Sequence, residues 1–398
     1  MATWINENFE LNNAILAVTF LQYPHIADAI AKCIKDVLEH WDLKTKVFSI
    51  TSDSRANMKL ACNKLGVKWV LCSAHILNLI VQKGLLSAKK LITQMNRLIT
   101  FFTAPKQSER LEIVQVLIQK QQKSNQEKNK ESIFLRAQND VVTRWNSTYN
   151  AWVRMLKLKP YIEILASSLT VQSERDAIED GKRLKSIIIT NDEWTTVAGI
   201  IKILKPFNDI TNYILGSSYL TMSIIYLTIS TLHNALLRDY VDEDIDICDT
   251  DEIDLDTMDN ISLFDLEEVL DDDEQIRSPT ATTNLVKRIK NIMSELFARY
   301  YQFDDNKILF IAMAIDPRCK NFEYEDAILK CQDYLRLEYN QIRSDEGLGS
   351  SSNEPTLDLS GLFISTVFTA VQQNTTYKNE VDQYLMMETI GPLDNPLQ

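Results

Sequence analysis

The chain has 398 residues, of which 45% are hydrophobic and 24% charged, so it has enough apolar side chains for globular cores. Only 9 residues are glycine, and no G-x-G-x-x-G or G-K-[ST] sequence occurs, which argues against a Gly-rich nucleotide-binding loop. The six cysteines form no C-x-x-C pair, and no apolar run approaches the roughly 18 residues of a membrane helix. We therefore expect a soluble intracellular protein with reduced thiols, no signal peptide and no membrane partner.

The net charge of −13 is concentrated in one segment. Residues 242–274 contain 17 acidic residues and no Lys or Arg, so the rest of the chain carries a net charge of +4. Such a run is typical of a disordered, solvated loop, and it is a candidate contact for basic protein partners. Residues 86–130 hold nine bases against three acids. This composition suits a nucleic-acid-binding surface or an ordinary solvated helix face, and composition alone leaves both open.

The first 85 residues alternate strand and helix patterns. Strands are predicted at residues 3–5, 14–21, 46–51 and 67–72. Helices are predicted at residues 24–41, 58–65 and 74–83. Gly66 is expected to end the second of these helices. This alternation predicts an α/β domain over residues 1–85.

From residue 86 the apolar spacing becomes helical, which predicts an all-α domain over residues 86–340 interrupted by the acidic loop 242–274. Its helices are predicted at residues 86–103, 109–120, 147–165, 191–214, 223–238, 283–301 and 325–339. Ser, Gly and charged residues indicate a linker at 341–361, and a C-terminal region at 362–398 begins with a predicted helix over 362–371.

Asp53 is the first candidate for chemistry, because it follows a predicted strand and precedes a predicted helix. Ligand and metal sites gather at such sheet edges, but Asp53 with Ser54 could equally cap the helix. Cys72 and His75 form a C-x-x-H, half of a zinc set. Because no second pair follows, we expect no zinc site, a hydrogen-bonding role for His75 and a core position for Cys72.

Arg144 and Trp145 are the second candidate. An adjacent guanidinium and indole could contact a phosphate and stack on an unpaired base. A tryptophan at a helix start is also a common core anchor, so both interpretations stay open.

Five ordered motifs resemble the catalytic region of hAT transposases and of their BED-finger relatives. They are SITSDSRANM at 49–58, CSAHILNLI at 72–80, TRWNSTY at 143–149, LKPF at 204–207 with YLT at 219–221, and AMAIDPRCK at 312–320. The resemblance implies a partial ribonuclease-H-like fold interrupted by a large helical insertion domain. It also implies a transposon-derived nuclear protein whose partner is DNA resembling transposon ends.

The resemblance also implies roles for individual residues. In the family, three carboxylates hold two divalent ions, Mg²⁺ or Mn²⁺, for phosphodiester attack. Asp53 matches the second carboxylate, and Cys72 and His75 match a motif near the active site. Arg144 and Trp145 match an Arg-Trp motif whose Trp stacks on a DNA base. Further DNA contacts are expected from the basic helices, at Lys89, Lys90 and Arg97.

The departures from the family pattern decide the expected activity. The first and third carboxylates, the BED zinc finger and most of the dimerisation segment have no counterpart, so we expect a chain truncated at both ends. One carboxylate cannot hold two hard cations, so we expect no cofactor and no catalysis by this chain alone. The alternatives are a domesticated nuclear helical interaction protein and the middle part of an active two-metal transposase.

Overall fold

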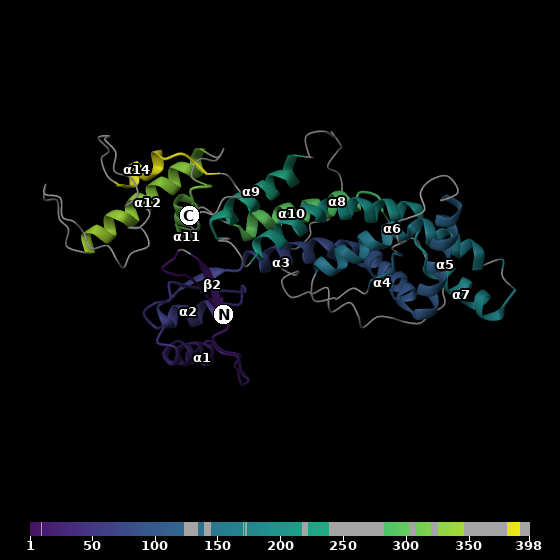
Figure 1. Ribbon diagram of the computed structural model, residues 1–398, viewed down its shortest axis with the longest axis horizontal. Coiled ribbons are helices and arrows are strands. Elements are labelled where there is room, and N and C mark those ends of the chain that lie inside the picture. The colour runs from purple at the N-terminus through teal and green to yellow at the C-terminus, as the bar shows by residue number, and fades with distance from the viewer. Residues whose placement is uncertain are drawn as a thin grey trace. The chain divides into compact units, whose positions relative to one another are not determined.

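The structure is a computed structural model that describes residues 1–8, 10–122, 134–138, 145–169, 171, 173–216, 222–238, 282–301, 307–319, 325–345 and 380–390. The strands of the described chain lie in its first 71 residues, and helices make up most of the rest of it (Figure 1). This agrees with the predicted combination of an α/β part and an all-α part. No helix among these residues has the length and apolarity to span a membrane.

The chain begins with an antiparallel hairpin of β1 (Ala2–Ile5) and β2 (Leu11–Ala14), in which Ala2 lies opposite Ala14. The turn is closed by Asn6, whose side-chain oxygen accepts backbone N–H bonds from Asn8 (3.0 Å) and Glu10 (2.8 Å). An Asn side chain that bonds its own local backbone is a common turn former. A hairpin at the start of the chain is therefore confirmed, with its first strand as predicted.

The second strand of the hairpin lies before its predicted position and shares only Ala14 with it. We expected residues 14–21 to be a strand, but β2 ends at Ala14. The register places Met1 opposite Ile15, so β1 offers no partner for the residues that follow. Without a ladder the apolar run stays exposed, with 94% of Val18 and 89% of Phe20 accessible.

The remaining α/β elements follow the predicted order. They are α1 (Ala27–His40), β3 (Ser49–Ser52), α2 (Ala56–Leu65) and β4 (Lys68–Leu71). Helices α1 and α2 pack together, and Lys64 pairs with Asp28 across them. Gly66 ends α2 with a φ of 69°, the left-handed geometry that favours glycine. Strand β3 pairs with β4 in a second two-stranded sheet.

The chain forms two compact units. The mixed unit comprises Met1–Val70, Tyr213–Thr231 and Gln302–Gln398, and the helical unit comprises Leu71–Asn212 and Leu232–Tyr301. The domain boundaries expected from the sequence stay predictions. The predicted acidic loop and the helix at 362–371 lie outside the described residues.

The helical unit is built from α-helices and one short 3₁₀ helix. Its elements are α3 (Ser73–Leu85), η1 (Leu86–Ala88), α4 (Lys89–Thr103), α5 (Pro105–Gln122), α6 (Trp145–Leu169), α7 (Arg175–Ile187), most of α8 (Asn191–Ile214), the end of α9 (Met222–Arg238) and α10 (Leu285–Tyr300). Helix α7 was not predicted. The core contains large, fully buried side chains, among them Phe102, Trp152, Phe207 and Phe297.

Helices α3 and α10 pack against each other and run in opposite directions. Tyr301, directly after α10, donates a 2.9 Å hydrogen bond to the carbonyl of Ser73 at the start of α3. At the other end of α3, Gly84 leaves room for the side chain of Met293. A Cβ at position 84 would lie 2.7 Å from Met293 Cγ, so the absence of a side chain permits the close approach.

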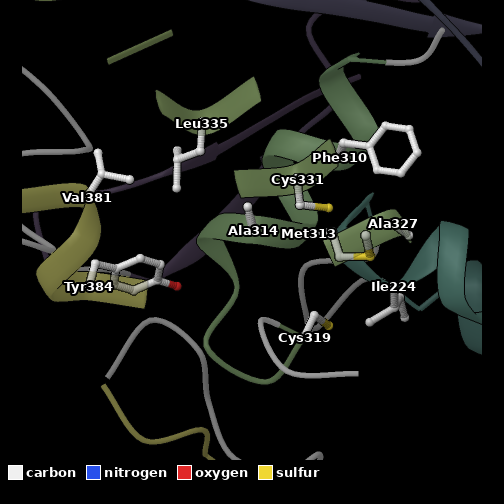
Figure 2. Packing of buried hydrophobic residues seen from close by; sticks show 10 residues of the cluster. All are labelled: Ile224, Phe310, Met313, Ala314, Cys319, Ala327, Cys331, Leu335, Val381 and Tyr384. Carbon is white, nitrogen blue, oxygen red and sulfur yellow. The ribbon is translucent and has the colours of Figure 1, made fainter. Parts of the chain in front are cut away.

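A second hydrophobic core, in addition to that of the helical unit, lies among the helices of the mixed unit. This core is formed by residues of α9, α11 (Lys307–Ile315), α12 (Glu325–Asp345) and α14 (Glu380–Met386). Figure 2 shows this cluster, which consists of Ile224, Phe310, Met313, Ala314, Cys319, Ala327, Cys331, Leu335, Val381 and Tyr384. Helices α11 and α14 were not predicted, and α12 extends six residues beyond its predicted end.

Candidate functional site

Asp53 follows the last residue of β3, as predicted, and its side chain is 36% exposed. Its Oδ1 atom accepts the backbone N–H of Arg55 at 3.4 Å, and its Oδ2 atom lies 3.4 Å from Arg55 Nε. Arg55 is itself the N-cap of α2, and no side chain caps this helix end. The proposed capping role of Asp53 is therefore not observed. The carboxylate instead stabilises the turn between strand and helix and pairs with Arg55.

The described residues hold no group of three or more His, Cys, Asp or Glu side chains that could bind a metal ion. Divalent cations of the Mg²⁺ type need several oxygen ligands in fixed geometry. Asp53, with Arg55 as its neighbour, does not fit that requirement by itself.

Cys72 and His75 lie at the start of α3, where Cys72 is the N-cap residue. Both side chains are half-buried. The hydrogen bond from Tyr301 to Ser73 fixes this helix start against the end of α10. Burial is the main reason why the pKa of Tyr301 is raised, so the phenol keeps its proton and acts as a donor. Tyr301 thus braces the C-x-x-H segment, a role that no local sequence pattern indicates.

Trp145 is the first residue of α6 and is only 3% exposed. Its ring meets Phe207 edge-on, with centroids 6.5 Å apart, and Phe207 in turn packs on Phe297. Trp145 is therefore a core anchor in this structure. Base stacking by Trp145 stays a prediction, and it would require the indole to leave this packing. Arg144 lies outside the described residues.

Lys89, Lys90 and Arg97 lie on α4, which contains no acidic residue. Lys89 and Lys90 are exposed and Arg97 is half-buried. At 100° per residue, the three bases fall within an arc of about 100°, on the side opposite the buried Leu91, Met95 and Leu98. The structure therefore places all three predicted bases on one face, which we call the α4 basic face.

Two family models match adjoining parts of the chain. Residues 1–82 match the model described as the ZBED1 RNase-like domain, and residues 70–203 match the one described as the ZBED1 RNase-like helical domain. The chain is also 23% identical to the putative AC transposase of Zea mays, over 56% of the chain and 27% of that protein. The resemblance predicted from the motifs is confirmed. The chain belongs to the hAT transposase-like family.

Two further relatives come from Oryza sativa subsp. japonica. The zinc finger BED domain-containing protein RICESLEEPER 1 is 26% identical over 46% of the chain and 26% of its own length. RICESLEEPER 3 is 21% identical over 86% of the chain and 40% of its own length. This hAT-like chain therefore spans about a quarter to two-fifths of the length of these curated relatives.

The hAT-like motif at 312–320 contains a buried ion pair that was not assigned a role from the sequence. The Asp316 carboxylate accepts three side-chain bonds from Arg318, at 2.9 Å from Nε to Oδ1, 3.3 Å from Nε to Oδ2 and 2.6 Å from Nη2 to Oδ2. Ser223, on α9, donates a further bond to Asp316 at 2.5 Å. Burial is the largest influence and raises the pKa of Asp316, but the bonds from Arg318 and Ser223 together outweigh it and lower this pKa. The pair is a structural link between α9 and the turn after α11.

Proposed function

We propose that this hAT transposase-like chain binds duplex DNA through the phosphate backbone, with the α4 basic face as a primary contact. The observation that carries the proposal is the placement of Lys89, Lys90 and Arg97 on one acid-free face. The surrounding sequence supports it, since residues 54–108 contain nine Lys or Arg residues and no Asp or Glu. Contact with the phosphate backbone of DNA needs positive charge without nearby carboxylates, and it does not require contacts with particular bases.

The test is the salt dependence of DNA binding by the full chain. Each phosphate contact adds about 0.9 to the slope of log affinity against log salt for duplex DNA. We expect a steep slope for the wild type, measured by fluorescence anisotropy, and a slope lower by about 2 for Lys89→Gln/Lys90→Gln.

A matched control removes two charges elsewhere on the helical unit. Lys182 and Lys185 are exposed bases on α7, a helix that also carries acidic residues. Lys182→Gln/Lys185→Gln should keep the wild-type slope. If the wild type shows no DNA binding at any salt concentration, the proposal is wrong. The interaction-protein alternative, with the acidic stretch 242–274 as the contact for basic partners, would then be preferred.

We also propose that the α/β part is a portion of a ribonuclease-H-like fold and that the chain alone does not cleave DNA. The match of residues 1–82 to an RNase-like domain supports the first part of this proposal. The second part is supported by the match of Asp53 to one of the family's three carboxylates. The test incubates the chain with labelled terminal-repeat DNA and Mg²⁺ or Mn²⁺. We expect no cleavage. Metal-dependent cleavage that is abolished by Asp53→Ala would contradict this proposal.

Nuclear location is the remaining proposal, and it is supported by the transposase and BED-finger relatives. A fluorescent fusion of the full chain should accumulate in the nucleus of transfected cells. Uniform or exclusively cytoplasmic fluorescence would argue against DNA as the partner in the cell.

A further inference from the structure

A second pair of adjacent bases lies on α10, a helix that packs against the segment just before α4 although it is almost 200 residues away in the sequence. Helix α10 packs against η1, the 3₁₀ helix that directly precedes Lys89 and Lys90. Because Tyr301 contacts the start of α3 and Met293 contacts its end, the first turns of α10 extend past the end of α3 toward η1. These first turns contain Lys287 and Arg288. All of these elements belong to the helical unit, so the placement lies within one compact body.

The side chains of these four bases are not paired with carboxylates of the described chain, so they can bind an external anion. Lys89, Lys90 and Arg288 are exposed and Lys287 is half-buried. Among the ion pairs of the described residues, none includes any of these four side chains, whereas Lys106 and Arg110 on α5 pair with Asp180. Residues 54–108 and 282–294 contain no Asp or Glu. These two stretches therefore carry positive charge only, and the acidic residue of α10, Glu295, lies seven residues after Arg288.

The bases also do not stabilise the helices on which they lie. Lys89 and Lys90 occupy the first turn of α4, and Lys287 and Arg288 lie near the start of α10, while neither helix has an acidic residue in its first turn. Positive side chains near a helix N-terminus are unfavourable by about 0.3–1 kcal/mol each at exposed positions. Stability of the helices thus gives no reason for this arrangement, whereas contact with a polyanion does.

We propose that Lys89, Lys90, Lys287 and Arg288 form one continuous phosphate-binding surface for the backbone of duplex DNA. This inference rests on the proposed DNA binding and adds α10 to the interface. Two pairs of adjacent bases on two separate elements suit an extended polyanion, because successive phosphates can be contacted without an enclosed pocket. The four bases contact phosphate groups only, so the contribution of this surface to DNA affinity does not depend on the base sequence.

The test compares Lys287→Gln/Arg288→Gln with the wild type and with the control Lys182→Gln/Lys185→Gln, all as full chains. Duplex DNA of random sequence is titrated by fluorescence anisotropy over a range of salt concentrations. We expect the slope of log affinity against log salt to fall by about 2 for the α10 variant and to stay unchanged for the control. In the variant that combines these two substitutions with Lys89→Gln/Lys90→Gln, the slope of log affinity against log salt should fall by about 4. Circular dichroism melting of each variant confirms that the helical unit is folded.

The outcomes separate the two proposals. If the wild type binds DNA but the α10 variant keeps the slope of the control, the inference is overturned and the DNA-binding proposal stands. If the wild type does not bind DNA, both fail. Poly-glutamate is the second probe. Binding of poly-glutamate that depends on the four bases, without binding of duplex DNA, would overturn the inference in favour of an acidic protein partner.

Discussion

The N-terminal α/β segment, residues 1–70, and the helical unit place their apolar side chains differently. The buried apolar residues of the α/β segment are mostly small, such as Ala27, Ala61 and Cys62, while Trp4, Ile15 and Phe20 stay exposed. The helical unit instead buries its large side chains, including Phe102, Trp152 and Phe207. Since buried apolar area is the main source of stability, a rigid surface is to be expected on the helical unit. This is the unit that carries the proposed DNA contacts.

The largest expected effect comes from removing a core side chain of the helical unit. Trp152 is fully buried in α6, so Trp152→Ala should lower the free energy of unfolding by about 3–5 kcal/mol. Urea denaturation followed by circular dichroism measures the loss. A loss below about 1 kcal/mol would mean that the helical unit is not tightly packed around Trp152.

The second effect probes the helical core of the mixed unit. Asp316→Ala leaves the guanidinium of Arg318 buried and unpaired, and breaking a buried ion pair in this way costs about 3–5 kcal/mol. The double variant Asp316→Ala/Arg318→Met removes both charges and should recover part of that stability. If the double variant is no more stable than Asp316→Ala, the pair itself is not the reason for the loss.

The same pair predicts a pH dependence. The pKa of Asp316 in the folded chain lies below the ordinary carboxyl value of 3.8, so the pair stabilises the fold above that value. Its contribution should disappear as the pH falls through 3.8 toward the lowered pKa. Denaturation at pH 7, 5 and 3 should therefore show a smaller stability difference between wild type and Asp316→Ala at pH 3. A constant difference would contradict the assignment.

Local periodicity predicted most of the helices but not the contacts that join them. The strong apolar spacing of residues 191–214 matches α8 residue for residue, because packing along one face determines that pattern. The run 14–21 was predicted as a strand, yet a strand also needs a partner, and β1 ends opposite Ala14. Similarly, buried Gln115 bonds both backbone groups of Leu135 across 20 residues, which no local pattern shows.

For the candidate site residues, too, the sequence predicted local positions but not the contacts between distant residues. The position of Asp53 after a strand was predicted correctly, because a strand end is a local feature. The burial of Trp145 against Phe207 depends on a residue 62 positions later, so the sequence left the core and stacking interpretations open. The addition of Lys287 and Arg288 to the α4 bases likewise depends on helix packing. Motifs predicted the family, and the fold was needed to place the charges.

A smaller effect is expected where α10 braces the start of α3. Tyr301→Phe removes the hydroxyl that bonds Ser73 while keeping the ring in its stack on Phe297. The expected loss is about 1 kcal/mol, the usual net value of one hydrogen bond. Hydrogen exchange should show faster exchange of the first amides of α3 in this variant and unchanged exchange in α6. Equal acceleration in both helices would indicate a general loss of packing rather than a local brace.

The smallest effect on stability is expected at the exposed run of the α/β segment. Phe20 is 89% exposed, so Phe20→Ser removes almost no buried area and should change the free energy of unfolding by less than about 0.5 kcal/mol. An uncharged, exposed, β-forming segment also promotes association, so the variant should be more soluble. Light scattering against concentration measures this change. A loss of 2 kcal/mol or more would show that the run is buried in solution and that the α/β segment, like the helical unit, has a core of large side chains.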